Sequence, residues 1–124
     1  MPERFNAEFW HYLDKLVNSS TVVIDRPRGS THPDYDDEVY PLDYGYLAGT
    51  TSSDGGGIDV WIGAAGSTRK GDHRVEGVLC TVDLVKRDTE LKILLGCSEE
   101  EMRIITGFVS SHHMGCYLLR RETE

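Results

Sequence analysis

The sequence lacks an excess of basic residues, a long apolar run and a secretion signal. Its 13 Lys and Arg residues are outnumbered by 21 Asp and Glu residues, which gives a formal net charge of −8. Such a field repels DNA, RNA and anionic lipids, so we expect no nucleic-acid partner and no membrane partner. Because no apolar run approaches the roughly 20 residues that span a bilayer, and the N-terminus lacks the layout of a signal peptide, we expect a cytoplasmic protein.

Cysteine is also scarce, and its spacing matches no common framework. The residues Cys80, Cys97 and Cys116 are odd in number and form no Cys-x-x-Cys pair. This pattern favours reduced thiols over a disulfide framework or a zinc site. A length of 124 residues is typical of one compact domain with its own core. We therefore expect a single domain that spans residues 1–124.

Apolar periodicity predicts a helix near each end of the chain. Over residues 6–17, apolar side chains recur on one helical face. Near the other end, Ser98 and the three glutamates that follow it form a capping box with acidic residues in the first turn. A second apolar stripe follows this box, made of Met102, Ile105, Phe108 and Val109.

The segments between the helices have the composition of short strands and turns. The expected strands cover residues 21–25, 38–46, 58–62, 75–85 and 90–95, and a last one covers 114–119. Short strands with a helix at each end are typical of an α+β domain. We predict a small closed OB-like β-barrel of five to six strands with a helix near each end.

Two pairs of aspartates have the same spacing and both lie where a strand meets a turn. Asp54 and Asp59 flank a glycine run, and Asp83 and Asp88 flank a polar turn. Four carboxylates from neighbouring hairpins would suit Mg²⁺ or Mn²⁺, which prefer oxygen ligands. The alternative is structural, because aspartate is also a common residue for capping a turn. The spacing alone leaves both interpretations open.

The segment EVYPLDYGYLAGT over residues 38–50, with SDGGGIDV over 53–60, resembles the core of soluble family I inorganic pyrophosphatases. Those enzymes carry Tyr-Pro-x-Asn-Tyr-Gly-Tyr/Phe, followed closely by Asp-Gly-Asp-Pro-hydrophobic-Asp. The resemblance continues through the second aspartate pair and a following lysine, and it covers about residues 20–95. It identifies the chain as similar to a divergent and shortened member.

The resemblance implies an enzyme that hydrolyses inorganic pyrophosphate, or a related diphosphate, to phosphate with Mg²⁺, or Mn²⁺, as cofactor. By position, the residues that match metal-binding aspartates of the family are Asp54, Asp59, Asp83 and Asp88. Tyr44 matches a tyrosine that contacts substrate, and we expect Tyr44 and Asp59 to serve catalysis. Bacterial members commonly form hexamers, which implies a homo-oligomer.

Basic residues are expected to hold the phosphoryl groups. Lys92 lies close to the phosphate-binding lysine of the family, although Glu90 stands at the matching spacing from Asp88. Arg26, after the first expected strand, can offer a guanidinium fork to phosphoryl oxygens. The alternative for Arg26 is a solvated loop charge. The chemistry needs such groups because diphosphate is a polyanion whose charge must be neutralised during transfer.

Several positions depart from the family pattern. Gly56 stands where the family has the acid implicated in activating water, and the phosphate-binding arginine aligns with His32. The Lys-x-Glu pair of the family aligns with Thr21 and Val23. Near the last helix, the family's Tyr-Lys pair falls near residues 112–114. These departures leave an alternative function: a catalytically degenerate module that binds metal or phosphate, or acts by assembly.

Overall fold

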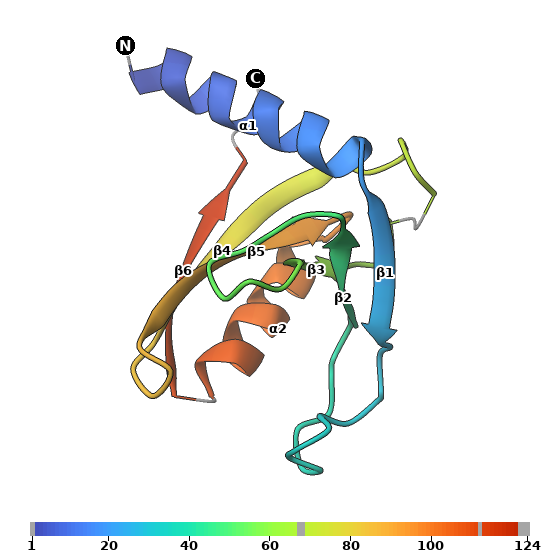
Figure 1. Cartoon of the computed structure of the whole chain (residues 1–124), viewed down its shortest axis with the longest axis vertical. Coiled ribbons are helices and arrows are strands. Elements are labelled where there is room, and N and C mark those ends of the chain that lie inside the picture. Colours follow the sequence, from blue (N-terminus) through green and yellow to red (C-terminus); the bar gives the residue numbers. More distant parts are fainter. Residues whose placement is uncertain (1, 67–68, 112, 122–124) are drawn as a thin grey trace.

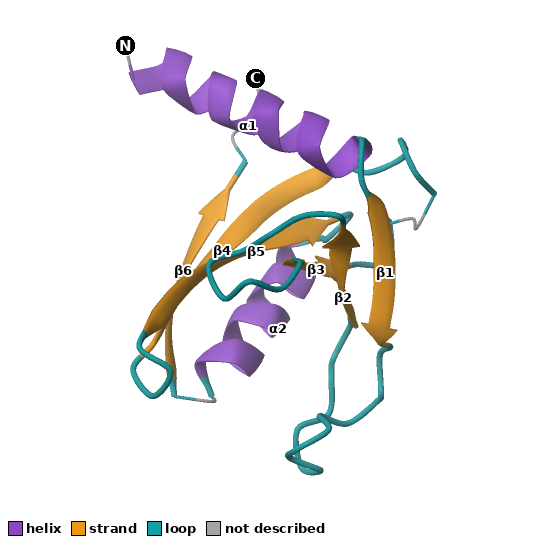
Figure 2. Cartoon of the chain, viewed as in Figure 1, coloured by secondary structure: helices purple, strands orange, loops and turns teal. Residues whose placement is uncertain are grey.

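A computed structural model of the chain describes residues 2–66, 69–111 and 113–121. Both predicted helices and all six predicted strands are present in it (Figures 1 and 2). In chain order, the elements are α1 (Pro2–Asn18), β1 (Thr21–Arg26), β2 (Asp43–Ala48), β3 (Ile58–Ile62), β4 (Val75–Asp83), β5 (Asp88–Leu95), α2 (Glu99–Ser110) and β6 (Met114–Arg120).

Several boundaries differ by one or two residues from the predicted ones, and the starts of α1 and β2 differ most. Helix α1 begins at Pro2, before the predicted start, because proline suits a first helical turn, where no intrahelical N–H bond is needed. Strand β2 begins only at Asp43, because residues 38–40 pair instead with the segment after β1. In that pairing, the Tyr40 carbonyl accepts from Gly29 N–H at 2.9 Å, and Tyr40 N–H donates to the Ser30 carbonyl at 2.9 Å.

The six strands form one sheet in the order β1-β2-β3-β5-β4-β6. Neighbouring strands are antiparallel except β3 and β5, which are parallel over Val60–Ile62 and Ile93–Leu95. Strands β1 and β6 lie at opposite edges, and no pairing joins them within the described residues. The predicted closed barrel is therefore not confirmed. One apolar face of this open sheet is buried under α1.

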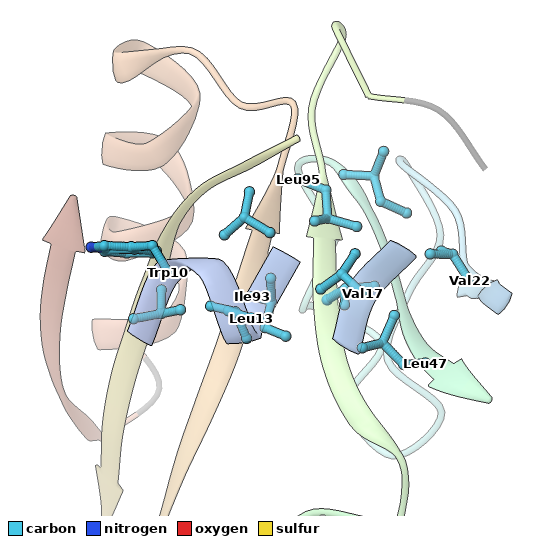
Figure 3. Packing of buried hydrophobic residues seen from close by; sticks show 11 residues of the cluster. Trp10, Leu13, Val17, Val22, Leu47, Ile93 and Leu95 are labelled. Atoms are coloured by element: carbon cyan, nitrogen blue, oxygen red, sulfur yellow. The ribbon is translucent and has the colours of Figure 1, made fainter. Parts of the chain in front are cut away.

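Alternation along the strands separates the two faces of the sheet. Val60, Val78 and Ile93 point to one face, where they form a core with Trp10, Leu13 and Val17 of α1. Figure 3 shows Trp10, Leu13 and Val17 beside the sheet residues of this cluster. The strand residues that alternate with these, among them Trp61, Leu79 and Leu94, point to the other face and pack with α2. The two helices therefore cover opposite faces.

The start of α2 is fixed by the predicted capping box. The Ser98 hydroxyl accepts from Glu101 N–H at 3.1 Å, and the Glu101 carboxylate accepts from Ser98 N–H at 2.8 Å. The same carboxylate accepts from Ala64 N–H at 2.9 Å, which ties the helix to the end of β3. Met102, Ile105 and Val109 are buried, as the apolar stripe predicted.

The cysteines of the chain are free thiols, as their spacing predicted. Cys97 is buried, and burial, reinforced by the nearby Glu101 carboxylate, raises the pKa of its thiol to about 12. The thiolate form that reacts or binds metal is therefore suppressed at neutral pH. In the parts of the chain that the structure describes, no helix combines the length and the apolar character needed to cross a membrane.

The Asp-Tyr-Gly-Tyr segment of β2 contains a glycine that the sheet requires. A Cβ atom added to Gly45 would lie 1.8 Å from the Val23 carbonyl oxygen, on the backbone of β1. Any side chain at this position would force β1 and β2 apart. The glycine therefore lets β1 approach β2 beside Tyr44 and Tyr46.

We expect Gly45→Ala to lower the free energy of unfolding by about 3 kcal/mol, because the overlap is with backbone that cannot move independently. Gly107→Ala is the matched control, since Gly107 lies inside α2 with no atom within 4 Å of an added Cβ. It should stabilise the fold by about 0.5–1 kcal/mol. Urea unfolding of both variants tests this, and similar shifts in both would contradict it.

Candidate functional site

All the site residues predicted from the sequence line one cleft of about 770 Å³ on the α2 face of the sheet. They are Arg26, Tyr44, Asp54, Asp59, Asp83, Asp88 and Lys92. Strand register explains the convergence. In the β2–β3 pair, Tyr46 lies opposite Asp59 and Tyr44 opposite Trp61. Residues two apart on β5, namely Asp88, Glu90 and Lys92, share one face.

Lys92 is the centre of the cleft, and its side chain is almost fully buried, with 7% of the residue exposed. Its Nζ atom donates to the Tyr44 hydroxyl oxygen at 2.9 Å and to Asp59 Oδ2 at 2.9 Å. A longer contact of 3.5 Å reaches Glu90 Oε2. An ammonium group has three N–H donors, so each donor has an oxygen partner.

The electrostatics of this group keep Lys92 charged. Burial by itself lowers the pKa of Lys92, but Tyr44 and the Asp59 carboxylate outweigh it, so the pKa is raised overall. Burial also raises the pKa of Tyr44, so its phenol is neutral at physiological pH. Burial raises the pKa of Glu90; Lys92 opposes that rise, and the carboxylates of Asp54 and Asp59 add to it.

Aromatic rings form the floor of the cleft next to Lys92. The Tyr44 and Trp61 rings are 4.6 Å apart between centroids, and Tyr40 and Phe108 are 5.4 Å apart. The Arg26 guanidinium donates to the Tyr40 hydroxyl and lies 5.9 Å from the Tyr44 ring centroid. The Lys92 ammonium lies 5.4 Å from the same centroid. Both cations are therefore within cation–π distance of the Tyr44 ring.

Two of the predicted aspartates hold turns. Asp54 Oδ1 accepts from Ser52 Oγ at 2.6 Å and from Gly56 N–H at 2.9 Å. These hydrogen bonds, that of Ser52 most, lower the pKa of Asp54 to about 2. Asp83 Oδ1 accepts from the N–H groups of residues 85 and 86 at 2.9 and 3.0 Å. These hydrogen bonds are those expected of turn-capping aspartates, and the Asp54 carboxylate also has a hydrogen bond with Glu90.

The aspartates do not form a resident metal site. Their carboxylate oxygens have the right chemistry for Mg²⁺, but within residues 2–66, 69–111 and 113–121 no three His, Cys, Asp or Glu side chains are arranged to hold a metal ion. One of the four, Asp59, accepts a hydrogen bond from Lys92. As arranged, the donor set therefore does not fit the Mg²⁺ cofactor that the resemblance implies.

Several lining residues were not predicted from the sequence. Asp25 precedes Arg26 at the end of β1, and the segment between β1 and β2 adds Tyr35, Asp37 and Glu38 to the cleft. Figure 1 shows this segment extending beyond the ends of β1 and β2. The sequence left the role of His112 and His113 open; His113 lines the cleft, with a positive φ of 64°, whereas His112 lies outside the described residues. The sequence offers one sign that Asp25 belongs to the site: it is an acidic residue at the end of an apolar strand.

The cleft is strongly acidic. Its described lining contains eight carboxylates and three Lys and Arg side chains, an excess of five negative charges with His neutral. The carboxylates are Asp25, Asp37, Glu38, Asp54, Asp59, Asp83, Asp88 and Glu90. Like charges in one cleft repel one another and attract cations. The cleft therefore attracts a ligand that carries positive charge, or an anion that arrives with its own cations.

Comparison with known proteins identifies the fold. No protein-family model matches the chain, and no curated protein sequence matches it. The structure is similar to an inorganic pyrophosphatase from Thermus thermophilus, with a TM-score of 0.52 and 20% identity over 81% of each chain. It is also similar to an inorganic phosphatase from Anaplasma phagocytophilum, with a TM-score of 0.52 and 18% identity over 80% of this chain and 81% of that one.

An inorganic pyrophosphatase from Coxiella burnetii gives a TM-score of 0.51 at 15% identity, over 86% of this chain and 80% of that one. Sequence identity at this level supports a shared fold and no more. The chain therefore has the fold of the inorganic pyrophosphatases to which its sequence motifs are similar.

Proposed function

We propose that the cleft binds a magnesium-complexed diphosphate and hydrolyses it to phosphate, with pyrophosphate as the simplest substrate. One observation carries the proposal. The seven residues assigned from the sequence come from strands β1, β2, β3, β4 and β5 and from the turns beside them, yet all of them line one cleft. The likeness of the fold to inorganic pyrophosphatases supports the same reaction class.

The charge of the cleft decides in which form the substrate binds. Free diphosphate is a polyanion, and the excess of five negative charges on the described lining repels it. Magnesium bound to the diphosphate neutralises much of that charge and presents a cation to the carboxylates. We therefore treat magnesium as part of the substrate, which enters the cleft with the diphosphate.

Two cations of the chain are placed to contact the phosphoryl oxygens. Arg26 has no carboxylate among its described hydrogen-bond partners, so its remaining N–H groups can bind phosphoryl oxygens in the two-pronged way typical of arginine. Lys92 can exchange its longest contact, the 3.5 Å one to Glu90, for a phosphoryl oxygen. Tyr44 and Asp59 keep the ammonium in place while this exchange occurs.

Turnover is expected to be slow. The resemblance places the acid that activates water at position 56, where this chain has glycine. Loss of a general base usually lowers a rate by about 10²- to 10⁴-fold. The second candidate function, a degenerate module that binds metal or phosphate without hydrolysis or acts by assembly, is favoured by this same glycine.

Phosphate release separates the two functions. We expect the purified chain to release phosphate from pyrophosphate with Mg²⁺ and not without it. Asp59→Asn should abolish the release, because the amide cannot hold the Lys92 ammonium by charge. Asp72→Asn, at an exposed aspartate outside the cleft, is the matched control and should keep it. Equal rates in the wild type and Asp59→Asn would reject hydrolysis and favour the degenerate module.

Restoring an acid at position 56 tests the reason given for slow turnover. Gly56 has no positive φ, and an added Cβ would lie 3.3 Å from Asp54 Oδ1, a side-chain atom that can shift slightly. We expect Gly56→Asp to raise the rate of phosphate release by about 10²-fold or more.

Gly56→Asn is the control, since it has the same size and no acid, and its rate should stay at the wild-type level. A steady-state phosphate assay on the three proteins measures this. An equal gain in the Asp and Asn variants would show that loop shape, rather than a missing base, limits the rate.

A further inference from the structure

We propose that the Lys92 ammonium replaces a resident divalent cation at the Asp59 and Glu90 carboxylates of the cleft, so that the free protein holds no Mg²⁺ or Mn²⁺ there. This inference concerns the protein without substrate and does not depend on hydrolysis. It follows from the misfit between the aspartate set and a resident metal, and from what occupies the carboxylates instead.

The geometry around Nζ is that of a built cation site. Asp59 Oδ2 and the Tyr44 hydroxyl oxygen are each 2.9 Å from Nζ, and Glu90 Oε2 is 3.5 Å away. The Lys92 side chain is 8% exposed, and the side chains of Glu90 and Asp59 are 13% and 28% exposed. Three oxygens from three different strands therefore surround one largely desolvated positive charge.

The oxygens cannot serve Lys92 and a metal ion together. Mg²⁺ requires ligand oxygens at about 2.0–2.1 Å in near-octahedral geometry. A metal ion bound to Asp59 and Glu90 would lie next to the ammonium, and the two cations would repel each other in a site of low dielectric constant. The ammonium must leave before a resident metal ion can bind these carboxylates.

Lys92 already neutralises part of the carboxylate charge that would otherwise attract a divalent ion. Asp59 and Glu90 together carry two negative charges when ionised, and Lys92 neutralises one of them. A divalent ion bound to Asp59 and Glu90 beside Lys92 would give these three side chains a net positive charge, which only the carboxylate of Asp54, a hydrogen-bond partner of Glu90, would offset, and it would break the hydrogen bonds of Lys92. Without Lys92, a divalent ion would balance the two carboxylates fully.

The position of Lys92 also makes it hard to displace. Lys92 and Glu90 are two residues apart on β5, so both side chains lie on the cleft face. The ammonium lies 5.4 Å from the Tyr44 ring centroid, within the distance of a cation–π contact. Movement of Lys92 away from Asp59 would cost it this contact and a charged hydrogen bond at once.

Metal binding to lysine variants tests the inference. Mn²⁺ and Mg²⁺ are titrated by calorimetry into the wild-type chain, Lys92→Met and Lys86→Met, and thermal unfolding is followed at each metal concentration. Lys86→Met is the matched control, because Lys86 is an exposed lysine that lines the same cleft and its loss makes the same change in charge.

We expect Lys92→Met to bind Mn²⁺ at least about tenfold more tightly than the other two proteins, and its melting temperature alone to rise with metal concentration. Tight Mn²⁺ binding by the wild type would overturn the inference. An equal gain in Lys86→Met would overturn it too, because the gain would then reflect net charge alone. A folded Lys92→Met chain with no gain would also overturn it.

A measurement on the wild-type chain covers the case in which Lys92→Met does not fold. The NMR signals of the Lys92 ammonium and the Asp59 carboxyl carbon should stay unchanged when Mg²⁺ is added without diphosphate. Saturable shifts of both signals would overturn the inference. Neither experiment measures phosphate release. The inference can therefore hold while the proposed hydrolysis fails, and it can fail while the hydrolysis is observed.

Discussion

The cleft depends on the hydrogen bonds and ion pairs of the Lys92 ammonium. It joins Tyr44 of β2, Asp59 of β3 and Glu90 of β5, which are three of the five strands that contribute to the site. Removing one partner of a buried ion pair typically costs about 3–5 kcal/mol, because the other charge is left without compensation. Here two carboxylates share one lysine, so the cleft keeps both its shape and its negative charge through a single side chain.

The sheet supplies the constraint that makes this possible. Alternate residues of the strands point to the α1 core or to the face that holds the α2 core and the cleft, and the parallel register of β3 and β5 places Asp59 and Lys92 on the same face. Gly45 allows β1 to approach β2, which brings Arg26 beside the Tyr40 and Tyr44 rings. One face of the sheet packs on α1, and the other combines the core under α2 with the acidic cleft.

Local features were predictable from the sequence, and long-range pairings were not. The capping box at Ser98 and the strand at Ile58–Ile62 follow from residues next to one another in the chain. The convergence of the site residues followed from a resemblance rather than from spacing. The bond between Lys92 and Asp59 joins residues 33 apart on parallel neighbours, and it requires the β3–β5 register, which no local pattern encodes. The predicted barrel closure was not confirmed for the same reason, since closure depends on the pairing of strands far apart in the chain.

Anomalous diffraction at the manganese edge tests the central claim most directly, on crystals of the protein with Mn²⁺ and with or without a non-hydrolysable diphosphate analogue. Without the analogue, the account predicts no manganese between Asp59 and Glu90, and Lys92 Nζ bonded to Asp59. With the analogue, manganese should lie beside its phosphoryl oxygens in the cleft. A manganese ion held by Asp59 and Glu90 in the absence of the analogue, with Lys92 turned away, would contradict the account.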